Sequence, residues 1–151
     1  MKAAEIGDAD AQYNVGQMYL NGEGVKEDFV EAVKWWRKAA EKGNADAQYN
    51  VGQTYLNGPG GKENFIEAVK WWRKAADQGV AEAQFKLGLS YFHGNGVVED
   101  NVLAYMWFNL AAAHGHKDGK QAKGILVERM TKEQIADAQK LSREWLAKHS
   151  K

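Results

Sequence analysis

Apolar residues recur at helical spacing in short segments that glycines separate. In the first segment Ala11, Val15, Met18 and Tyr19 follow the three- and four-residue spacing of one helix face. In the next segment, residues 29–40, the apolar side chains cover one arc of about 160° when each residue advances by 100°. The pattern therefore predicts two amphipathic helices joined by a turn.

The expected helices carry recognisable start and stop signals. The N-cap positions of the first helices are occupied by Asp8 and Asn44. Those of the second helices are occupied by Asp28 and Asn64, and in these two cases a Glu follows three residues later. The turns NGEG, NGPG and HGNG, beginning at residues 21, 57 and 93, end the first helices. The second helices are expected to stop at Gly43, Gly79 and Gly115.

This helix pair repeats with a period of 36 residues. Residues 8–43 and 44–79 are identical at 28 of 36 positions, and residues 80–115 share thirteen positions with 44–79. A fixed period in this range predicts a solenoid, so we expect an all-α fold, an α/α right-handed superhelix. The expected divisions are a remnant of a preceding repeat helix (1–7), three repeats (8–43, 44–79, 80–115) and a degenerate C-terminal repeat with a capping helix (116–151).

The sequence KWWRKAA, at 34–40 and again at 70–76, decides between a binding site and a packing unit. The helical arc predicts that both tryptophans point at the core, one toward the first helix of its own unit and the other toward the next unit. Gly16, Gly52 and Gly88 lie inside first helices, which predicts that another helix crosses there closely. In the last helix a capping box at Thr131 precedes one apolar face: Ile135, Ala138, Leu141, Trp145 and Leu146.

Composition narrows the classes of function. The 151 residues carry 20 Lys and Arg against 20 Asp and Glu, so no net charge draws the chain to nucleic acid or an anionic membrane. The absence of Cys removes disulfides and thiolate chemistry and leaves the compartment open between periplasm and cytoplasm. We find no transmembrane segment or signal peptide in the sequence, and favour a monomer.

The sequence contains few residues in patterns typical of a catalytic, cofactor or metal site. The glycine turns lack the context of a dinucleotide or phosphate loop, and His114 with His116 has no further imidazole at ligand spacing. The serines form no triad motif, so we expect no enzyme, no cofactor and no metal. A basic stripe on the second helices is interrupted by Glu31, Glu41 and Glu67, which favours a solvated face over nucleic-acid binding.

The repeat resembles that of the Sel-one-like repeat family, relatives of the tetratricopeptide repeats. The resemblance rests on the segment ADAQYNVGQMYLNGEGVKEDFVEAVKWWRKAAEKGN. It is similar to the family pattern A-x-A-x-x-x-L-G-x-x-Y, then G-x-G-V, then D-Y-x-x-A-x-x-W. Gly61 departs from the G-x-G-V turn in the second repeat. The resemblance implies a superhelix that acts as an adaptor and binds other proteins.

By analogy with tetratricopeptide repeats, the first helices are expected to line a concave groove for a protein or peptide. On each helix the candidate positions lie on one side, beside the packing face. Tyr13 and Leu20 could equally pack between units, and the more apolar third repeat is expected to contribute most affinity. The candidate partner-binding residues are Asp10, Tyr13, Gln17, Asn21, Asp46, Tyr49, Gln53, Asn57, Glu82, Phe85, Leu89 and His93.

Two other interpretations remain open from the sequence. Some cysteine-rich bacterial members of the resembled family have been linked to peptidoglycan or penicillin, which makes a periplasmic cell-wall or β-lactam-binding protein the alternative function. The missing cysteines weaken that analogy. The near identity of the first two repeats would also suit a consensus-like or shortened repeat protein.

Overall fold

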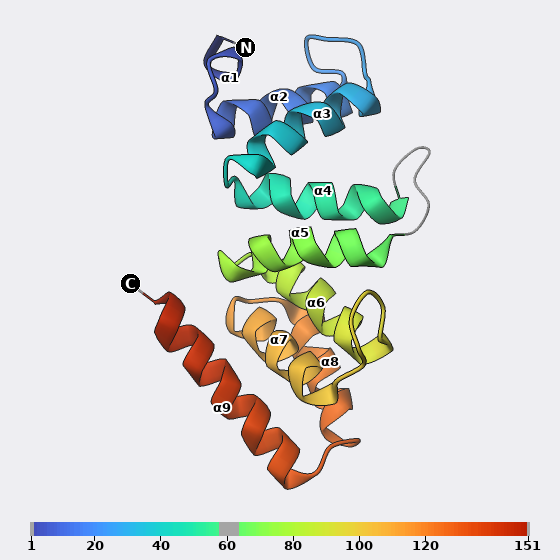
Figure 1. Ribbon diagram of the computed structural model, residues 1–151, viewed down its shortest axis with the longest axis vertical. Coiled ribbons are helices and arrows are strands. Elements are labelled where there is room, and N and C mark those ends of the chain that lie inside the picture. Colours follow the sequence, from blue (N-terminus) through green and yellow to red (C-terminus); the bar gives the residue numbers. More distant parts are fainter. Residues whose placement is uncertain (1, 58–63, 151) are drawn as a thin grey trace. The chain divides into compact units, whose positions relative to one another are not determined.

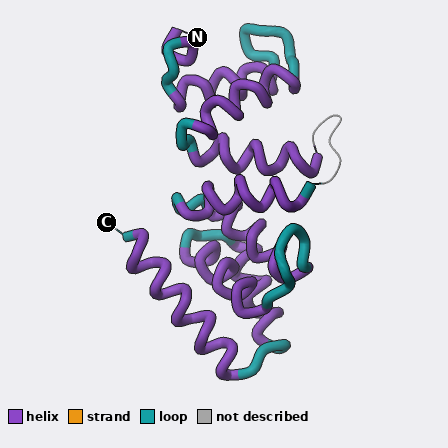
Figure 2. Tube along the Cα trace, in the orientation of Figure 1, coloured by secondary structure: helices purple, strands orange, loops and turns teal. Residues whose placement is uncertain are grey.

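The computed structural model describes residues 2–57 and 64–150, and within these ranges it contains helices and loops but no strand (Figure 2). The turn NGPG and the departure at Gly61 lie outside the described residues. The helices of the described ranges are α1 (Lys2–Glu5), α2 (Ala9–Asn21), α3 (Phe29–Glu41), α4 (Ala45–Asn57), α5 (Phe65–Asp77), α6 (Ala81–His93), α7 (Asn101–Ala113), α8 (Lys117–Val127) and α9 (Lys132–His149).

The chain divides into two compact units, Met1–Trp71 and Trp72–Lys151, each of which we describe by itself. In the first unit α2 packs on α1 and α3, and α3 packs on α4. In the second unit α6 packs on α7, and α7 packs on both α8 and α9 (Figure 1). These contacts, mostly between successive helices, are the packing of an α/α solenoid and confirm the expected fold class.

The helix ends follow the predicted signals. Asp8 accepts a hydrogen bond from the Ala11 amide at 2.9 Å, and Asp28 accepts one from the Glu31 amide at 3.2 Å. At the last helix, Thr131 and Gln134 make both bonds of the capping box. These bonds satisfy amide groups that the first helical turn leaves without a partner.

The predicted close crossing of helices occurs at Gly16 and at Gly88. A Cβ atom on Gly16 would overlap the indole ring of Trp36 on α3, and one on Gly88 would overlap the ring of Phe108 on α7. Both glycines are buried. The missing side chain is therefore what lets the two helices of each repeat approach.

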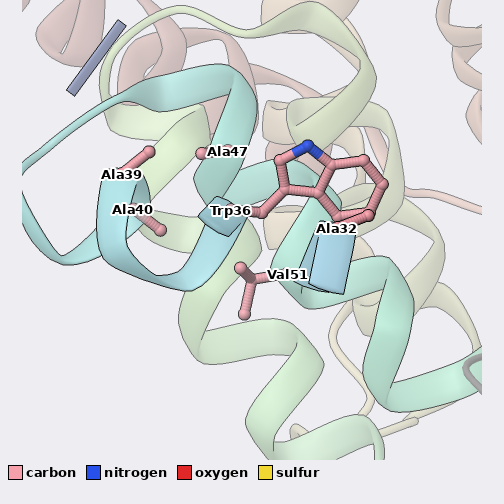
Figure 3. Packing of buried hydrophobic residues seen from close by; sticks show 6 residues of the cluster. All are labelled: Ala32, Trp36, Ala39, Ala40, Ala47 and Val51. Carbon is pink, nitrogen blue, oxygen red and sulfur yellow. The ribbon is translucent and has the colours of Figure 1, made fainter. Parts of the chain in front are cut away.

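The two tryptophans of KWWRKAA have different surroundings. Trp36 is 4% exposed and joins a cluster from α3 and α4 (Figure 3): Ala32, Trp36, Ala39, Ala40, Ala47 and Val51. Trp71, one period after Trp35, also packs against this cluster. Trp35 itself is only half-buried and lines a surface depression, with the Lys38 ammonium 4.5 Å from its ring centre. The core interpretation thus holds for Trp36 and Trp71 and is wrong for Trp35.

The last two helices depart from the sequence expectations in detail. Ala138 is buried as expected, but the other buried residue of α9 is Ser142, while Leu146 is 38% exposed. The Ser142 hydroxyl donates to the Ala138 carbonyl at 3.0 Å, which lets a polar residue occupy the packing face. Gly124 keeps the register of Gly16 and Gly88, yet a Cβ atom there would meet nothing within 4 Å.

We predict opposite effects of Ala at two helical glycines in the same repeat register. Gly16→Ala should destabilise, because forcing extra volume into a packed site costs about 1–3 kcal/mol, more than the roughly 1 kcal/mol that Ala gains in helix propensity. Gly124→Ala should stabilise by the propensity gain alone. Thermal unfolding followed by circular dichroism measures both, and equal stabilisation of the two variants would contradict the close-crossing argument.

Candidate functional site

The first two repeats form a depression on the side that the sequence predicts for partner binding. It has a volume of about 280 Å³ and lies in the first unit, between residues of α2, α3 and α4. Of the predicted positions it includes Tyr13, Gln17 and Gln53. We call this feature the α2–α4 groove; its lining residues are Tyr13, Gln17, Leu20, Phe29, Trp36, Asn50, Gln53 and Thr54.

Three polar atoms in the lining of the α2–α4 groove have no hydrogen-bond partner. They are Oε1 of Gln17, Oε1 of Gln53 and the indole Nε1 of Trp36, and all three are buried. An unsatisfied buried donor or acceptor costs about 1–3 kcal/mol. The two glutamine oxygens are therefore acceptors that a ligand in the groove could satisfy, whereas the indole Nε1 lies at the crossing with Gly16.

Tyr13 connects the two first helices at this groove. Burial raises the pKa of the Tyr13 phenol, the Asp46 carboxylate raises it further, and a hydrogen bond with the Asn50 side chain acts in the opposite direction. Tyr13 belongs to α2, whereas Asp46 and Asn50 belong to α4. The side chain is thus partly used to join repeats, in line with the packing alternative, while it also lines the groove.

Two of the predicted acidic residues bind the following repeat. The Asn44 side chain donates to Asp10 Oδ1 at 2.8 Å. At the same register two repeats further on, in the second unit, the His116 Nε2 lies 2.9 Å from Glu82 Oε1. Asn44 and His116 also accept helix-capping bonds from their own first turns, so Asp10 and Glu82 each secure the start of the next helix.

The predicted residues of the third repeat lie on α6 in a more crowded setting. The Phe85 ring stacks on His116 at 4.5 Å between centroids, and Leu89 is half-buried. His93 is exposed and meets the Phe92 ring edge-on at 4.9 Å. The third repeat was expected to bind a partner through its apolar side chains. Its aromatic rings, however, are already in contact with neighbouring residues of the second unit.

The remaining predicted residues lie at or near the ends of the first helices. Asn21, the last residue of α2, is exposed and donates to Glu23 at 3.2 Å. Asn57 is exposed at the end of α4, and Tyr49 is half-buried on the same helix. None of the three belongs to the lining of the α2–α4 groove.

A glutamine contact between repeats escaped the sequence analysis. Gln12, Gln48 and Gln84 are buried, and their Nε2 atoms donate at 3.1, 3.2 and 3.1 Å to the carbonyls of Ala4, Ala40 and Ala76. Each is a second hydrogen bond to a carbonyl in the last turn of the preceding helix, which also accepts from the amide of the glycine that follows it. The recurrence of Gln at one register in all three repeats is the signal that could have revealed it.

Arg37 and Arg73, two of the cations that form the basic stripe expected on the second helices, also have structural partners. Arg37 donates to the Tyr55 hydroxyl at 2.9 Å, and Arg73 donates to the Tyr91 hydroxyl at 2.7 Å. Both bonds join a second helix to the first helix of the following repeat. The expectation that these cations belong only to a solvated face is therefore wrong for Arg37 and Arg73.

The described residues were also searched for a metal-binding cluster and for a membrane-spanning helix. Across residues 2–57 and 64–150, no three or more His, Asp or Glu side chains are placed to hold a metal ion. No helix in that part of the chain has the length and apolar character needed to cross a bilayer.

The stacked helix pairs define the class as an α/α repeat protein, and sequence comparison gives the family. The Sel1 repeat model matches residues 9–44, 45–80 and 81–116, so the chain belongs to the Sel1 repeat family. Proteins of this kind are generally non-catalytic scaffolds for protein–protein interactions. A search of curated proteins found no match.

Two solved structures are similar over most or all of the chain. A Sel1 repeat protein from Oxalobacter formigenes is 37% identical, with a TM-score of 0.77, over 82% of this chain and 92% of its own. The protein c5321, a protective antigen of uropathogenic Escherichia coli with an SLR fold, is 32% identical, with a TM-score of 0.75. That match covers 99% of this chain, which spans only 40% of c5321.

We predict that Asp46→Asn lowers the pKa of Tyr13, because a nearby carboxylate disfavours the phenolate. The pKa should stay above its ordinary value, since burial is the larger cause of the shift. Ring carbon NMR of labelled tyrosines, assigned with Tyr13→Phe, follows the titration. Glu41→Gln, an exposed change on α3, serves as the control; an unchanged pKa in Asp46→Asn would contradict the predicted contact between α2 and α4.

Proposed function

We propose that this protein is an interaction scaffold whose α2–α4 groove binds an extended peptide segment of a partner protein. The general role of Sel1 repeats supports the class of function. The observation that carries the specific site is the pair of unpartnered glutamine oxygens, on Gln17 and Gln53, in the lining of one depression.

The chemistry of the groove suits a peptide backbone. An extended peptide presents N–H donors and C=O acceptors alternately along its length. The amide oxygens of Gln17 and Gln53 can accept hydrogen bonds from peptide N–H groups. Because both oxygens are buried, we propose that the two glutamine side chains turn toward the peptide when it binds.

Apolar residues in the same groove would add side-chain affinity. Leu20 and Phe29 belong to its lining, and both are half-buried, so a bound apolar side chain would remove further area from water. Tyr13 supplies a rigid ring with a polar end, a residue type that binding sites favour. These features support recognition of a peptide with alternating apolar side chains.

The wider set of predicted residues enters this proposal in different roles. Asn21 and Asn57, exposed at the ends of α2 and α4, could extend the contacts of a longer peptide. Asp10 and Glu82 act chiefly in joining repeats, as their bonds to Asn44 and His116 suggest. A contribution of the third repeat through Phe85, Leu89 and His93 stays a prediction.

The test replaces both groove glutamines by leucine, which keeps a similar side-chain volume. Peptides selected from a random display library on the wild-type protein serve as probes, with affinity measured by calorimetry. Loss of two hydrogen bonds at about 0.5–1.5 kcal/mol each should weaken binding by about five- to 150-fold. Helicity should be unchanged and stability equal or higher, because the variant no longer buries unpaired oxygens.

The matched control is Gln121→Leu with Gln139→Leu, two exposed glutamines on α8 and α9. This variant adds the same apolar surface without touching the groove, so its affinity should equal that of the wild type. The groove proposal fails if the Gln17 and Gln53 variant binds the selected peptides as tightly as the control does.

A further inference from the structure

Three helix C-termini meet in the second unit. The residues that follow or end α5, α7 and α9 enclose a depression of about 330 Å³, to which Asp77, Gly79, His114, Trp145, His149 and Ser150 contribute. We call this feature the C-terminal pocket. A helix C-terminus carries roughly half a negative elementary charge, so the convergence of three makes the pocket electronegative.

Hydrogen bonds fix the tautomer of His114 on one side of the pocket. Its Nδ1 lies 2.8 Å from the Leu110 carbonyl oxygen and 3.0 Å from Gln84 Oε1. The Gln84 amide nitrogen is engaged with the Ala76 carbonyl, so its oxygen faces the imidazole as an acceptor. Because both partners accept, Nδ1 carries the proton and Nε2, beside Gly79, holds a free lone pair.

His149 repeats this arrangement on α9. Its Nδ1 lies 2.8 Å from the carbonyl oxygen of Trp145, four residues earlier on the helix. The neutral imidazole therefore also has its proton on Nδ1 and an acceptor at Nε2. Its ring stacks on the Trp145 indole at 3.9 Å with an interplanar angle of 12°, which fixes its orientation.

Asp77 completes the set of acceptors. Its carboxylate accepts a long hydrogen bond, 3.4 Å, from the indole Nε1 of Trp145. An ionised carboxylate has about four lone-pair sites, so this bond leaves most of its capacity free. Among residues 2–57 and 64–150, no lysine or arginine lines the pocket.

We propose that the C-terminal pocket binds a cationic side chain, arginine or lysine, of a partner protein. A guanidinium or ammonium group consists only of donors, which the carboxylate and the two imidazole lone pairs match. The volume lies at the lower end of the range of about 300–1,000 Å³ that is typical of ligand pockets, which suits one side chain. The inference concerns the second unit and is independent of the α2–α4 groove.

The test titrates the full chain with N-acetyl-arginine-N-methylamide and its lysine counterpart near pH 7.5. NMR should show saturable shifts of the Trp145 indole N–H and of the His114 and His149 rings. The citrulline analogue, which has nearly the shape of arginine but no charge, should bind at least tenfold more weakly, about the worth of a charged hydrogen bond.

Two variants test the assigned acceptors. Asp77→Asn should weaken arginine binding about tenfold, and His149→Phe should weaken it several-fold while keeping the stack on Trp145. Asp137→Asn, an exposed change on α9 with the same loss of charge, should bind like the wild type. Equal binding of citrulline, unchanged affinity in Asp77→Asn, or absence of saturable shifts would overturn the proposal.

Discussion

The close approach of the two helices within a repeat is the constraint on which the rest of the structure depends. Gly16 against Trp36, and Gly88 against Phe108, remove a Cβ atom where a large ring of the second helix crosses the first. The ring then fills the space between the helices, and small residues such as Ala39 and Ala40 complete the packing. Side chains beside this contact remain available for joining repeats or binding a partner.

The sequence predicts this framework well because a period repeats the same information. The helix caps at Asp8, Asp28 and Thr131 and the crossing glycines follow local rules, and the structure confirms them. The sequence pattern does not distinguish the exposure of Trp35 from that of Trp36. Both lie on the apolar arc of the helix, and their exposure depends on what lies against each face, which the periodicity of one helix does not specify.

The candidate site was harder to predict for a related reason. The spacing indicates one side of the first helices for binding, and Gln17 and Gln53 from that side line the groove. It does not reveal that Asp10 is engaged by Asn44, because that bond joins residues 34 positions apart. Pairing over such distances depends on the offset between stacked helices, so side chains that hold repeats together and side chains that face a ligand look alike in sequence.

The buried glutamines carry a consequence for how the solenoid comes apart. Each one lies in a first helix and donates to a carbonyl at the end of the helix before it, as Gln48 does to Ala40. When such a first helix opens, the Ala40 carbonyl keeps the bond from the Gly43 amide but loses its second partner. When the preceding helix opens, the buried Gln48 amide loses the same bond, so the unfolding of each repeat is coupled to that of its neighbour in both directions.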